Sequence, residues 1–536
     1  MGILDSININ SLIERTKAKI KEIYLKDDMP WVIGYSGGKD STCTTQIIID
    51  ALLDLNENNI PLHKKVYVIS SDTMVETPMI IKTIEETINN INVLAMRFNL
   101  PIEAQIIRPS ITKSFWMNLI GRGYPCPNQT FRWCTDRLKI EPANRFIESI
   151  IQEHGEAVMI LGVREGESTS RDRVLDNHTI EGKDLMRHTT QENSYVFAPI
   201  RLFTKDDVWN YLLNNKSPWG SDNAKLFKLY SDSLTGEECP IMMSEEDKKK
   251  TTCGNSRFGC WVCTVVQEDK SLTGFIKSGI TWLKPLLEYR NWIYSIRDDE
   301  NRRMKIRRNG SIYFSKVETD SSGNIVIPTK GSKAKIIIKC IQDRWIDSND
   351  QEWQVFTSSN SEQEAQDYIV KNGIKLEDGI NPKIIIKKID DKFYQLGQGP
   401  FTLKTRKEML DRLLEVQSEL NNGYELIKRD ELVEIQKLWY EEGDLENSVH
   451  LIYKKYYAND FELVKDDVQL LSDDDFEQLR ALCITNDVNF KLFNELMDIE
   501  KSNFGYKRRS EALKQIKLKL NQEYLSLTQK DDTDEN

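Results

Sequence analysis

The sequence predicts an α/β protein built on a doubly wound parallel sheet, and three observations support this. Short apolar runs alternate with amphipathic segments over the first 230 residues, which is typical of parallel strands covered by helices on both faces. A glycine-rich turn follows the first apolar run, at "WVIGYSGGKDST" (31–42). Polar residues recur where later runs end, and ligands bind at such strand ends in open parallel sheets.

The order of the predicted elements alternates between helix and strand. The helix at 41–55 is expected to begin at its hydroxyl side chains, because Ser and Thr favour helix starts. The predicted helices are residues 9–27, 41–55, 76–98 and 141–154, and the predicted strands are residues 31–35, 65–71, 102–108 and 157–163.

The chain has 536 residues, which is too long for a single core. Changes in composition divide it into five parts. These are an α/β domain (1–230), a cysteine-rich region (231–295), a charged mixed α/β segment with short β-like runs (296–400), a mainly helical region (401–527) and a disordered acidic tail (528–536).

Composition narrows the class of protein. No run approaches the ~20 apolar residues that a membrane span needs, and the first residues lack a secretory signal. We therefore expect a cytoplasmic protein that does not associate with a membrane. The net charge of −11 argues against nonspecific nucleic-acid binding by the whole surface. Two basic stretches, 302–311 and 330–340, are candidates for a local basic groove, although solvated faces are the simpler interpretation.

The glycine-rich turn has the residues of a phosphate site. It lacks the Gly-Lys-Ser/Thr ending of a motor or kinase loop. Two glycines and a helix start offer bare backbone N–H groups to an anion, and Lys39 adds a cation. We interpret this segment as a pyrophosphate cradle.

Nine cysteines in a cytoplasmic chain do not indicate a disulfide framework. Cys43, Cys340 and Cys483 are expected to be small buried residues, and Cys126 receives no role. A set of four, Cys239, Cys253, Cys260 and Cys263, falls within 25 positions. Without histidine partners, such a set fits a thiolate cage for zinc or for an iron–sulfur cluster.

The glycine-rich turn resembles the signature of the PP-loop ATP pyrophosphatase superfamily, which has the adenine nucleotide alpha hydrolase-like fold. Three further segments resemble its adenosine-reductase branch: "SSDTMVETP" (70–78), "GVREGESTSRDR" (162–173) and "FAPIRLFTKDDVWNYL" (197–212). The resemblance implies ATP cleavage between the α and β phosphates and adenylation of a substrate oxygen. Lys39 would neutralise the leaving pyrophosphate, and Asp40 or Asp72 would help to hold Mg²⁺.

The same resemblance assigns the predicted site. The catalytic residues are Lys39, Asp40, Cys134 and Arg164. The ATP-binding residues are Ser36, Gly37, Gly38, Lys39, Asp40, Ser41, Asp72, Thr73, Gly162 and Arg164. The substrate-binding residues are Glu167, Ser168 and Arg171.

The cysteines also resemble those of this branch. "FGCWVCT" (258–264) and "RWCTDRLKIEP" (132–142) are similar to the segments that hold a 4Fe-4S cluster in sulfonucleotide reductases. This chain departs from them, because it has Trp133-Cys134 where they have adjacent cysteines. Either Cys239, Cys253, Cys260 and Cys263 bind the cluster and Cys134 carries sulfur, or Cys134 is a ligand and Cys239 is spare. We favour the first assignment, because those four are local in sequence.

Together with "GQGPFTLKTRKEMLDRLLEVQ" (397–417), these segments most resemble the DNA phosphorothioation family. That resemblance implies adenylation of a DNA phosphate and replacement of a non-bridging oxygen by sulfur. It implies DNA, a cysteine desulfurase and other DNA phosphorothioation proteins as partners. The alternatives are a sulfonucleotide reductase, a tRNA thiolase and an ATP-bound scaffold with a structural metal.

Overall fold

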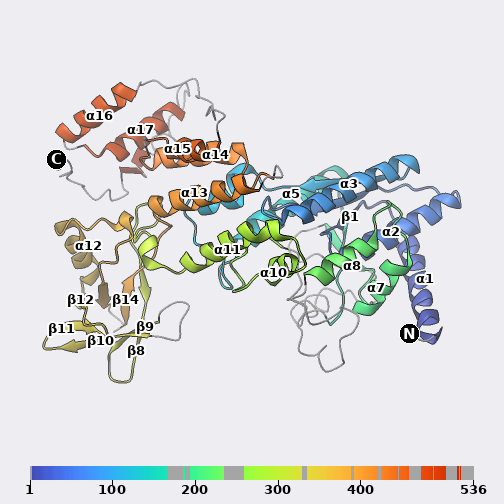
Figure 1. Ribbon diagram of the computed structural model, residues 1–536, viewed down its shortest axis with the longest axis horizontal. Coiled ribbons are helices and arrows are strands. Elements are labelled where there is room, and N and C mark those ends of the chain that lie inside the picture. The colour runs from blue at the N-terminus through green and yellow to red at the C-terminus, as the bar shows by residue number, and fades with distance from the viewer. Residues whose placement is uncertain are drawn as a thin grey trace. The chain divides into compact units, whose positions relative to one another are not determined.

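The computed structural model describes most of the chain (Figure 1). The described residues are 3–166, 185–187, 193–233, 259–328, 335–387, 392–420, 424–444, 446–457, 473–486, 488–502, 516–517 and 519–520. They form two compact units. Unit 1 comprises residues 1–115, 127–291 and 420–426, and unit 2 comprises residues 116–126, 292–419 and 427–536.

Unit 1 contains the predicted parallel sheet, which confirms the α/β fold class. Its strand order is β3-β2-β1-β4-β6-β5, and every pairing is parallel except that of the edge strand β5 with β6. The strands are β1 (Trp31–Gly34), β2 (Val66–Ser71), β3 (Ile102–Ile107), β4 (Ala157–Ile160), β5 (Met186–Arg187) and β6 (Ser194–Phe197).

Alternation along the strands places helices on both faces of this sheet. Trp31 and Ile33 pack into a large core with α1, α2, α3 and α7, whereas Val32 packs with residues of α5 on the other face. The helices of unit 1 are α1 (Ile3–Lys26), α2 (Lys39–Glu57), α3 (Pro78–Arg97), α4 (Trp133–Thr135), α5 (Glu141–His154), α7 (Lys205–Asn214), α8 (Asn223–Asp232) and α10 (Lys270–Lys277), and α11 (Lys284–Ile296) runs from unit 1 into unit 2.

The strand order creates a switch point next to β1. The chain runs from β1 outward to β2 and β3, and then returns to the other side of β1 to form β4. Loops that leave β1 and β4 diverge at this point, and such a crevice is where open α/β sheets bind ligands. The glycine-rich turn follows β1, and Arg164 follows β4.

Unit 2 contains a second sheet, of order β7-β14-β13-β12-β11-β10-β9-β8. Its two end strands, β7 and β8, are separated in sequence only by Val317, which is buried. Residues 314–319 therefore join both ends of the sheet and close it into a barrel. The strands are β7 (Phe314–Lys316), β8 (Glu318–Thr319), β9 (Ile325–Pro328), β10 (Lys335–Ile341), β11 (Arg344–Asp347), β12 (Glu352–Phe356), β13 (Ile384–Lys387) and β14 (Phe393–Leu396).

The remaining elements of unit 2 are helical. Helix α12 connects β12 to β13, the parallel pair of the barrel. The helices are α12 (Ser361–Lys371), α13 (Leu403–Glu419), α14 (Arg429–Glu441), α15 (Ser448–Tyr456), α16 (Asp473–Thr485) and α17 (Phe490–Ser502). Among the described helices, none is long and apolar enough to cross a membrane. The predicted tail, 528–536, lies outside the described residues.

The expectation for Cys340 is wrong, because this residue is exposed, whereas Cys43 and Cys483 are buried as expected. Beyond Ile338, β10 pairs only with β11 and no longer with β9. The end of β10 thus has a single neighbouring strand, and Cys340 lies on that end.

Candidate functional site

The phosphate loop, residues 35–38, connects β1 to α2. Gly37 has φ 71°, and a Cβ there would lie 2.9 Å from Ile84 Cγ1, so this position requires glycine. Ser36 N–H donates to Ser41 Oγ at 3.1 Å, and Ser41 Oγ donates to the Gly38 carbonyl at 3.0 Å. These bonds hold the loop against the first turn of α2.

The helix begins two residues earlier than predicted. Gly38 is extended and caps α2, and Lys39 and Asp40 form its first turn. An acidic residue in the first turn complements the helix dipole. Lys39 and Asp40 therefore belong to the rigid helix and not to the loop.

Asp40 joins two cations across the switch point. Its carboxylate accepts from Lys39 Nζ at 2.6 Å and from Arg164 Nε at 2.6 Å. All three side chains are mostly buried, with 16% of Asp40, 9% of Lys39 and 6% of Arg164 exposed. The structure thus brings the predicted residues Lys39, Asp40 and Arg164 into one charged group.

Gly162 allows this close approach. A Cβ on Gly162 would lie 2.8 Å from the Asp40 carbonyl oxygen and 2.9 Å from Thr44 Oγ1. Any side chain there would push the segment after β4 away from α2. Glu167, Ser168 and Arg171, the predicted substrate-binding residues, lie outside the described residues.

Asp72 follows β2, and each of its carboxylate oxygens accepts a hydrogen bond. Its Oδ2 accepts from Arg108 Nε at 2.7 Å, and its Oδ1 accepts from Met74 N–H at 2.8 Å. Met74 has φ 63°, a left-handed conformation that the carboxylate stabilises. Asp40 and Asp72 are both paired with cations, so Mg²⁺ would share either carboxylate with a cationic side chain or displace that side chain.

A second cluster lies after β2, around the thiol of Cys260. Thr73 Oγ1 is 3.3 Å from Cys260 Sγ and donates to Glu76 Oε1 at 3.0 Å. Lys139 Nζ is 3.4 Å from the same Glu76 oxygen, and this carboxylate raises the pKa of Lys139. Residue Thr73, predicted to bind ATP, is therefore the direct neighbour of a predicted cluster cysteine.

Three thiols share this region. Burial, followed by the nearby Glu76 carboxylate, raises the pKa of Cys260. Burial, followed by the nearby Cys263 thiol, raises the pKa of Cys134. Cys134 and Cys263 are thus close enough for their charges to interact, a proximity that sequence spacing left open. Cys239 and Cys253 lie outside the described residues, so both ligand assignments remain predictions.

Thiols, the side chains that bind iron–sulfur clusters, are the donors that the described part of this region offers. Across the described residues, no three His, Cys, Asp or Glu side chains converge on a single metal ion. A four-iron cluster takes one thiolate on each iron, so its ligands stand farther apart than those of one zinc ion. Under the first assignment, Cys260 and Cys263 would hold such a cluster with Cys239 and Cys253, and under the second, Cys134 would take the place of Cys239.

Arg290 on α11 fixes the loop that carries Cys263. Its guanidinium is completely buried and donates to the carbonyls of Cys263 at 2.8 Å and Gln267 at 2.7 Å, and also to that of Val266. Thr264 Oγ1 donates to the Pro127 carbonyl at 2.7 Å. The cysteine loop is therefore held by buried hydrogen bonds.

Sequence reasoning missed several residues of this site. Tyr230, whose hydroxyl accepts from the Lys39 backbone N–H, lies far in sequence from the phosphate loop, and Arg108 and Arg290 are likewise distant from the motifs that they contact, so no local pattern marks these residues. Lys139 lies inside the "RWCTDRLKIEP" segment. The resemblance of that segment to a family motif could have marked Lys139 as a site residue.

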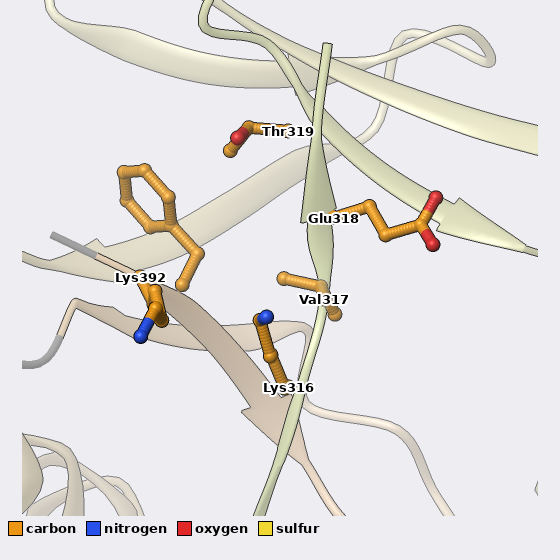
Figure 2. Close-up of a pocket in the computed structure, with 6 residues that line it drawn as sticks. Lys316, Val317, Glu318, Thr319 and Lys392 are labelled. Atoms are coloured by element: carbon orange, nitrogen blue, oxygen red, sulfur yellow. The ribbon is translucent and has the colours of Figure 1, made fainter. Parts of the chain in front are cut away.

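A surface hollow of about 290 Å³ lies in unit 2, at the bend between β7 and β8. Figure 2 shows Lys316 and Lys392 on one side of strand 316–319, with the Glu318 carboxylate pointing away from them. None of the predicted site residues lines this hollow. It is distinct from the phosphate loop.

The basic stretch 302–311 is largely occupied by internal contacts of unit 2. Arg303 donates to the Gly399 carbonyl, and Arg308 lies 3.5 Å from Glu442. Arg307 stacks over the ring of Tyr313, 4.3 Å from its centroid. Residues 330–334 of the second stretch lie outside the described residues. These three arginines of the first stretch therefore make contacts within unit 2, which favours the structural interpretation over a nucleic-acid groove.

Fold and site together define a nucleotide-binding α/β domain of the PP-loop type. Residues 30–266 match the family profile of the phosphoadenosine phosphosulfate reductase domain. This part of the chain, less than half of its length, is similar to the phosphoadenosine phosphosulfate reductase domain.

One curated relative is an uncharacterized protein from Methanocaldococcus jannaschii. The two are 28% identical over 250 residues, which are 46% of this chain and 43% of that protein. The chain thus matches less than half the length of this relative.

Three solved structures show weak overall similarity. A phosphoadenylyl-sulfate reductase from Candida auris is 13% identical, with a TM-score of 0.26 over 41% of this chain and 91% of that chain. An FMN adenylyltransferase from Candida glabrata is 15% identical, with a TM-score of 0.25 over 43% and 65%. The tRNA thiolase NcsA from Methanococcus maripaludis, solved with its 4Fe-4S cluster, is 12% identical, with a TM-score of 0.24 over 54% and 79%. Similarities this low carry no information about function.

Proposed function

We propose that this chain is a DNA phosphorothioation enzyme of the DndC type. It would use ATP to adenylate a DNA backbone phosphate and would support replacement of a non-bridging oxygen by sulfur. The observation that carries the proposal is the position of two groups at the carboxyl ends of two neighbouring strands. The phosphate loop follows β1, and the Cys260 thiol contacts Thr73 directly after the neighbouring strand β2.

The first step is adenylation. A non-bridging oxygen of the DNA phosphate attacks the α-phosphorus of ATP, and pyrophosphate leaves. The phosphate loop and Lys39 bind the departing pyrophosphate. Arg164 neutralises charge at the α-phosphate, because its planar guanidinium matches phosphate oxygens. Asp40 holds both cations in position until the nucleotide binds.

The second step is sulfur transfer. A sulfur nucleophile attacks the DNA phosphorus, and AMP leaves with the former phosphate oxygen. With sulfide as the nucleophile, no electrons are exchanged. A persulfide on Cys134 would in addition require a thiol to cleave its S–S bond after transfer. A 4Fe-4S cluster bound by the thiols would provide a site for sulfide.

Partners are part of the proposal. Sulfur would come from a cysteine desulfurase, and other phosphorothioation proteins would deliver DNA to a chain whose net charge is negative. The compartment proposed is the cytoplasm.

Release of pyrophosphate tests the adenylation step. Anaerobically purified chain is incubated with ATP and Mg²⁺ and with duplex DNA, tRNA or adenosine phosphosulfate in separate reactions. We expect release to be stimulated by DNA, and labelled sulfur from a desulfurase to appear in DNA. Stimulation by tRNA alone would favour a thiolase, and stimulation by neither nucleic acid would contradict an enzyme that adenylates nucleic acid.

Substitution of the cysteines tests the sulfur step. Iron content and the visible spectrum are measured after each of Cys134, Cys239, Cys253, Cys260 and Cys263 is changed to serine. Loss of iron in Cys134→Ser but not in Cys239→Ser would identify Cys134 as a ligand. The reverse pattern would leave Cys134 as the sulfur carrier.

A further inference from the structure

Tyr230 covers the start of α2 from the last turn of α8. The Lys39 backbone N–H donates to the Tyr230 hydroxyl oxygen at 3.1 Å. A Cβ on Gly38 would lie 3.2 Å from the same oxygen, and Lys39 Nζ lies 5.8 Å from the centre of the Tyr230 ring. The phenol therefore contacts both the backbone and the charged residue of the phosphate loop.

The amide of Lys39 has one hydrogen, so it cannot donate fully to Tyr230 and to a phosphate oxygen at the same time. A phosphate bound in the loop would use this N–H, because it belongs to the first turn of a helix and has no acceptor within the helix. The phenol oxygen stands where an oxygen of the phosphate would accept. Tyr230 and the nucleotide are thus alternative partners of one donor.

We propose that the Tyr230 hydroxyl competes with the phosphates of ATP for the Lys39 amide and thereby lowers the affinity for nucleotide. The inference rests on the proposed nucleotide function of this loop. Because an oxygen already satisfies the amide in the absence of ATP, binding must first break that hydrogen bond. Tyr230 is therefore a positioning residue that sets affinity.

The ring itself is held in place by packing. Trp209 meets it edge to face, with ring centroids 5.2 Å apart, and the Tyr230 carbonyl accepts from Ser233 Oγ at 2.8 Å. Phenylalanine would keep these contacts and remove only the oxygen. The variant Tyr230→Phe therefore isolates the competing acceptor.

The test measures equilibrium binding of pyrophosphate, of a non-hydrolysable ATP analogue and of adenosine to the whole chain by titration calorimetry. We expect Tyr230→Phe to bind pyrophosphate and the analogue about fivefold more tightly, as expected from one net hydrogen bond of ~1 kcal/mol. Adenosine affinity should not change. A purely structural role would weaken binding, so the sign of the change is diagnostic.

Tyr195→Phe is the matched control, because its hydroxyl donates to Glu156 at 3.2 Å, away from the loop. It should leave all affinities unchanged. Unchanged or weaker binding of pyrophosphate by Tyr230→Phe would overturn the inference, as would equal tightening in the control. If Tyr230→Phe does not fold, Tyr230→Leu, which also lacks the oxygen, decides by the same criteria.

The two proposals fail in different ways. Tighter pyrophosphate binding by the variant would uphold the role of Tyr230 even if DNA stimulates no pyrophosphate release. Absence of pyrophosphate and ATP binding in the wild-type chain would contradict both proposals.

Discussion

At the scale of single residues, the charge balance at Asp40 governs the candidate site. Two buried cations, Lys39 and Arg164, share this one carboxylate. Their mutual repulsion is balanced only while the carboxylate is present. In the proposed reaction, an incoming phosphate would supply the same negative charge.

Replacement of Asp40 by asparagine should therefore destabilise the nucleotide-free chain. Loss of one partner from a buried ion pair costs on the order of 3 kcal/mol. Added pyrophosphate should restore much of the loss, because it neutralises the same cations. Thermal unfolding with and without pyrophosphate measures both effects.

Asp54→Asn is the matched control in the same helix. Asp54 pairs with Lys17 and Lys21 at the other end of α2 and is 34% exposed. Its variant should lose little stability, and pyrophosphate should raise its unfolding temperature by the same amount as in the wild type. An Asp40→Asn variant that responds to pyrophosphate no more than this control would contradict the role of Asp40.

At the scale of elements, Arg290 links α11 to the cysteine loop. It is completely buried and donates to three carbonyls of residues 263–267. The loop has few backbone bonds of its own, apart from Cys263 N–H to the Cys260 carbonyl at 3.1 Å. The geometry of the thiols therefore depends on a residue of another element.

We expect Arg290→Gln to lower stability by roughly 2–4 kcal/mol, since three buried carbonyls lose charged donors. Iron content of the anaerobic protein should fall as the loop loses its shape. Arg145→Gln, at a position whose side chain is 55% exposed, should change neither quantity. Full iron content in Arg290→Gln would show that the thiols are positioned without it.

Asp347, the last residue of β11, has an ionisable side chain that stabilises the turn to β12 in the barrel. Burial opposes ionisation of Asp347, but hydrogen bonds from the Trp353 indole and from the Asn349 and Gln351 backbones outweigh it and hold the pKa of Asp347 below its usual range. A carboxyl whose pKa is lowered by folding stabilises the folded state above its unfolded pKa, about 3.9. That contribution is lost as the pH falls through the folded-state pKa.

Asp347→Asn should accordingly be less stable than the wild type at pH 7, by about 1–2 kcal/mol. The difference should shrink as the pH falls below about 4. Urea unfolding followed by tryptophan fluorescence from pH 7 down to pH 3 measures the difference. A difference that stays constant over this range would mean that ionisation of Asp347 contributes nothing.

At the scale of the whole molecule, the described residues of the candidate nucleotide site belong to unit 1. Its described parts are the phosphate loop, the segment after β2 and the segment after β4. The barrel of unit 2 has its own apolar core, formed by Ile325, Ile338, Trp353 and their neighbours.

Hydrogen exchange of the whole chain should therefore respond locally to nucleotide. A non-hydrolysable ATP analogue should slow exchange in peptides covering residues 35–42 and 161–164, because bound phosphate uses their N–H groups. Peptides from the barrel strands 335–341 and 352–356 serve as the internal control and should not change. Protection of the barrel without protection of the loop would place the nucleotide elsewhere.

Much of unit 1 could be predicted from the sequence. The helices and strands that were predicted between residues 31 and 160 begin and end within a few residues of their predicted positions, whereas α4 and the short helical turns between residues 111 and 140 were not predicted. Buried parallel strands are apolar along their whole length, and the helices between them repeat their apolar residues every three or four positions. These patterns are local, so the sequence displays them directly.

The barrel of unit 2 could not be predicted in the same way. Its strands are short, and its closure depends on β7 and β8 pairing with different partners on either side of Val317. Pairing partners that are distant in sequence leave no local pattern. The sequence therefore indicated only short β-like runs in residues 296–400.

The sequence by itself determined the α/β class, the phosphate loop and the residue types of a phosphate and thiol chemistry, because each depends on neighbouring residues along the chain. Only the tertiary structure decided which of these residues meet. It paired Asp40 with Arg164 and set the Tyr230 hydroxyl against the Lys39 amide. Such contacts join residues separated by more than a hundred positions, and they form only when packing of the sheet and its helices brings those segments together.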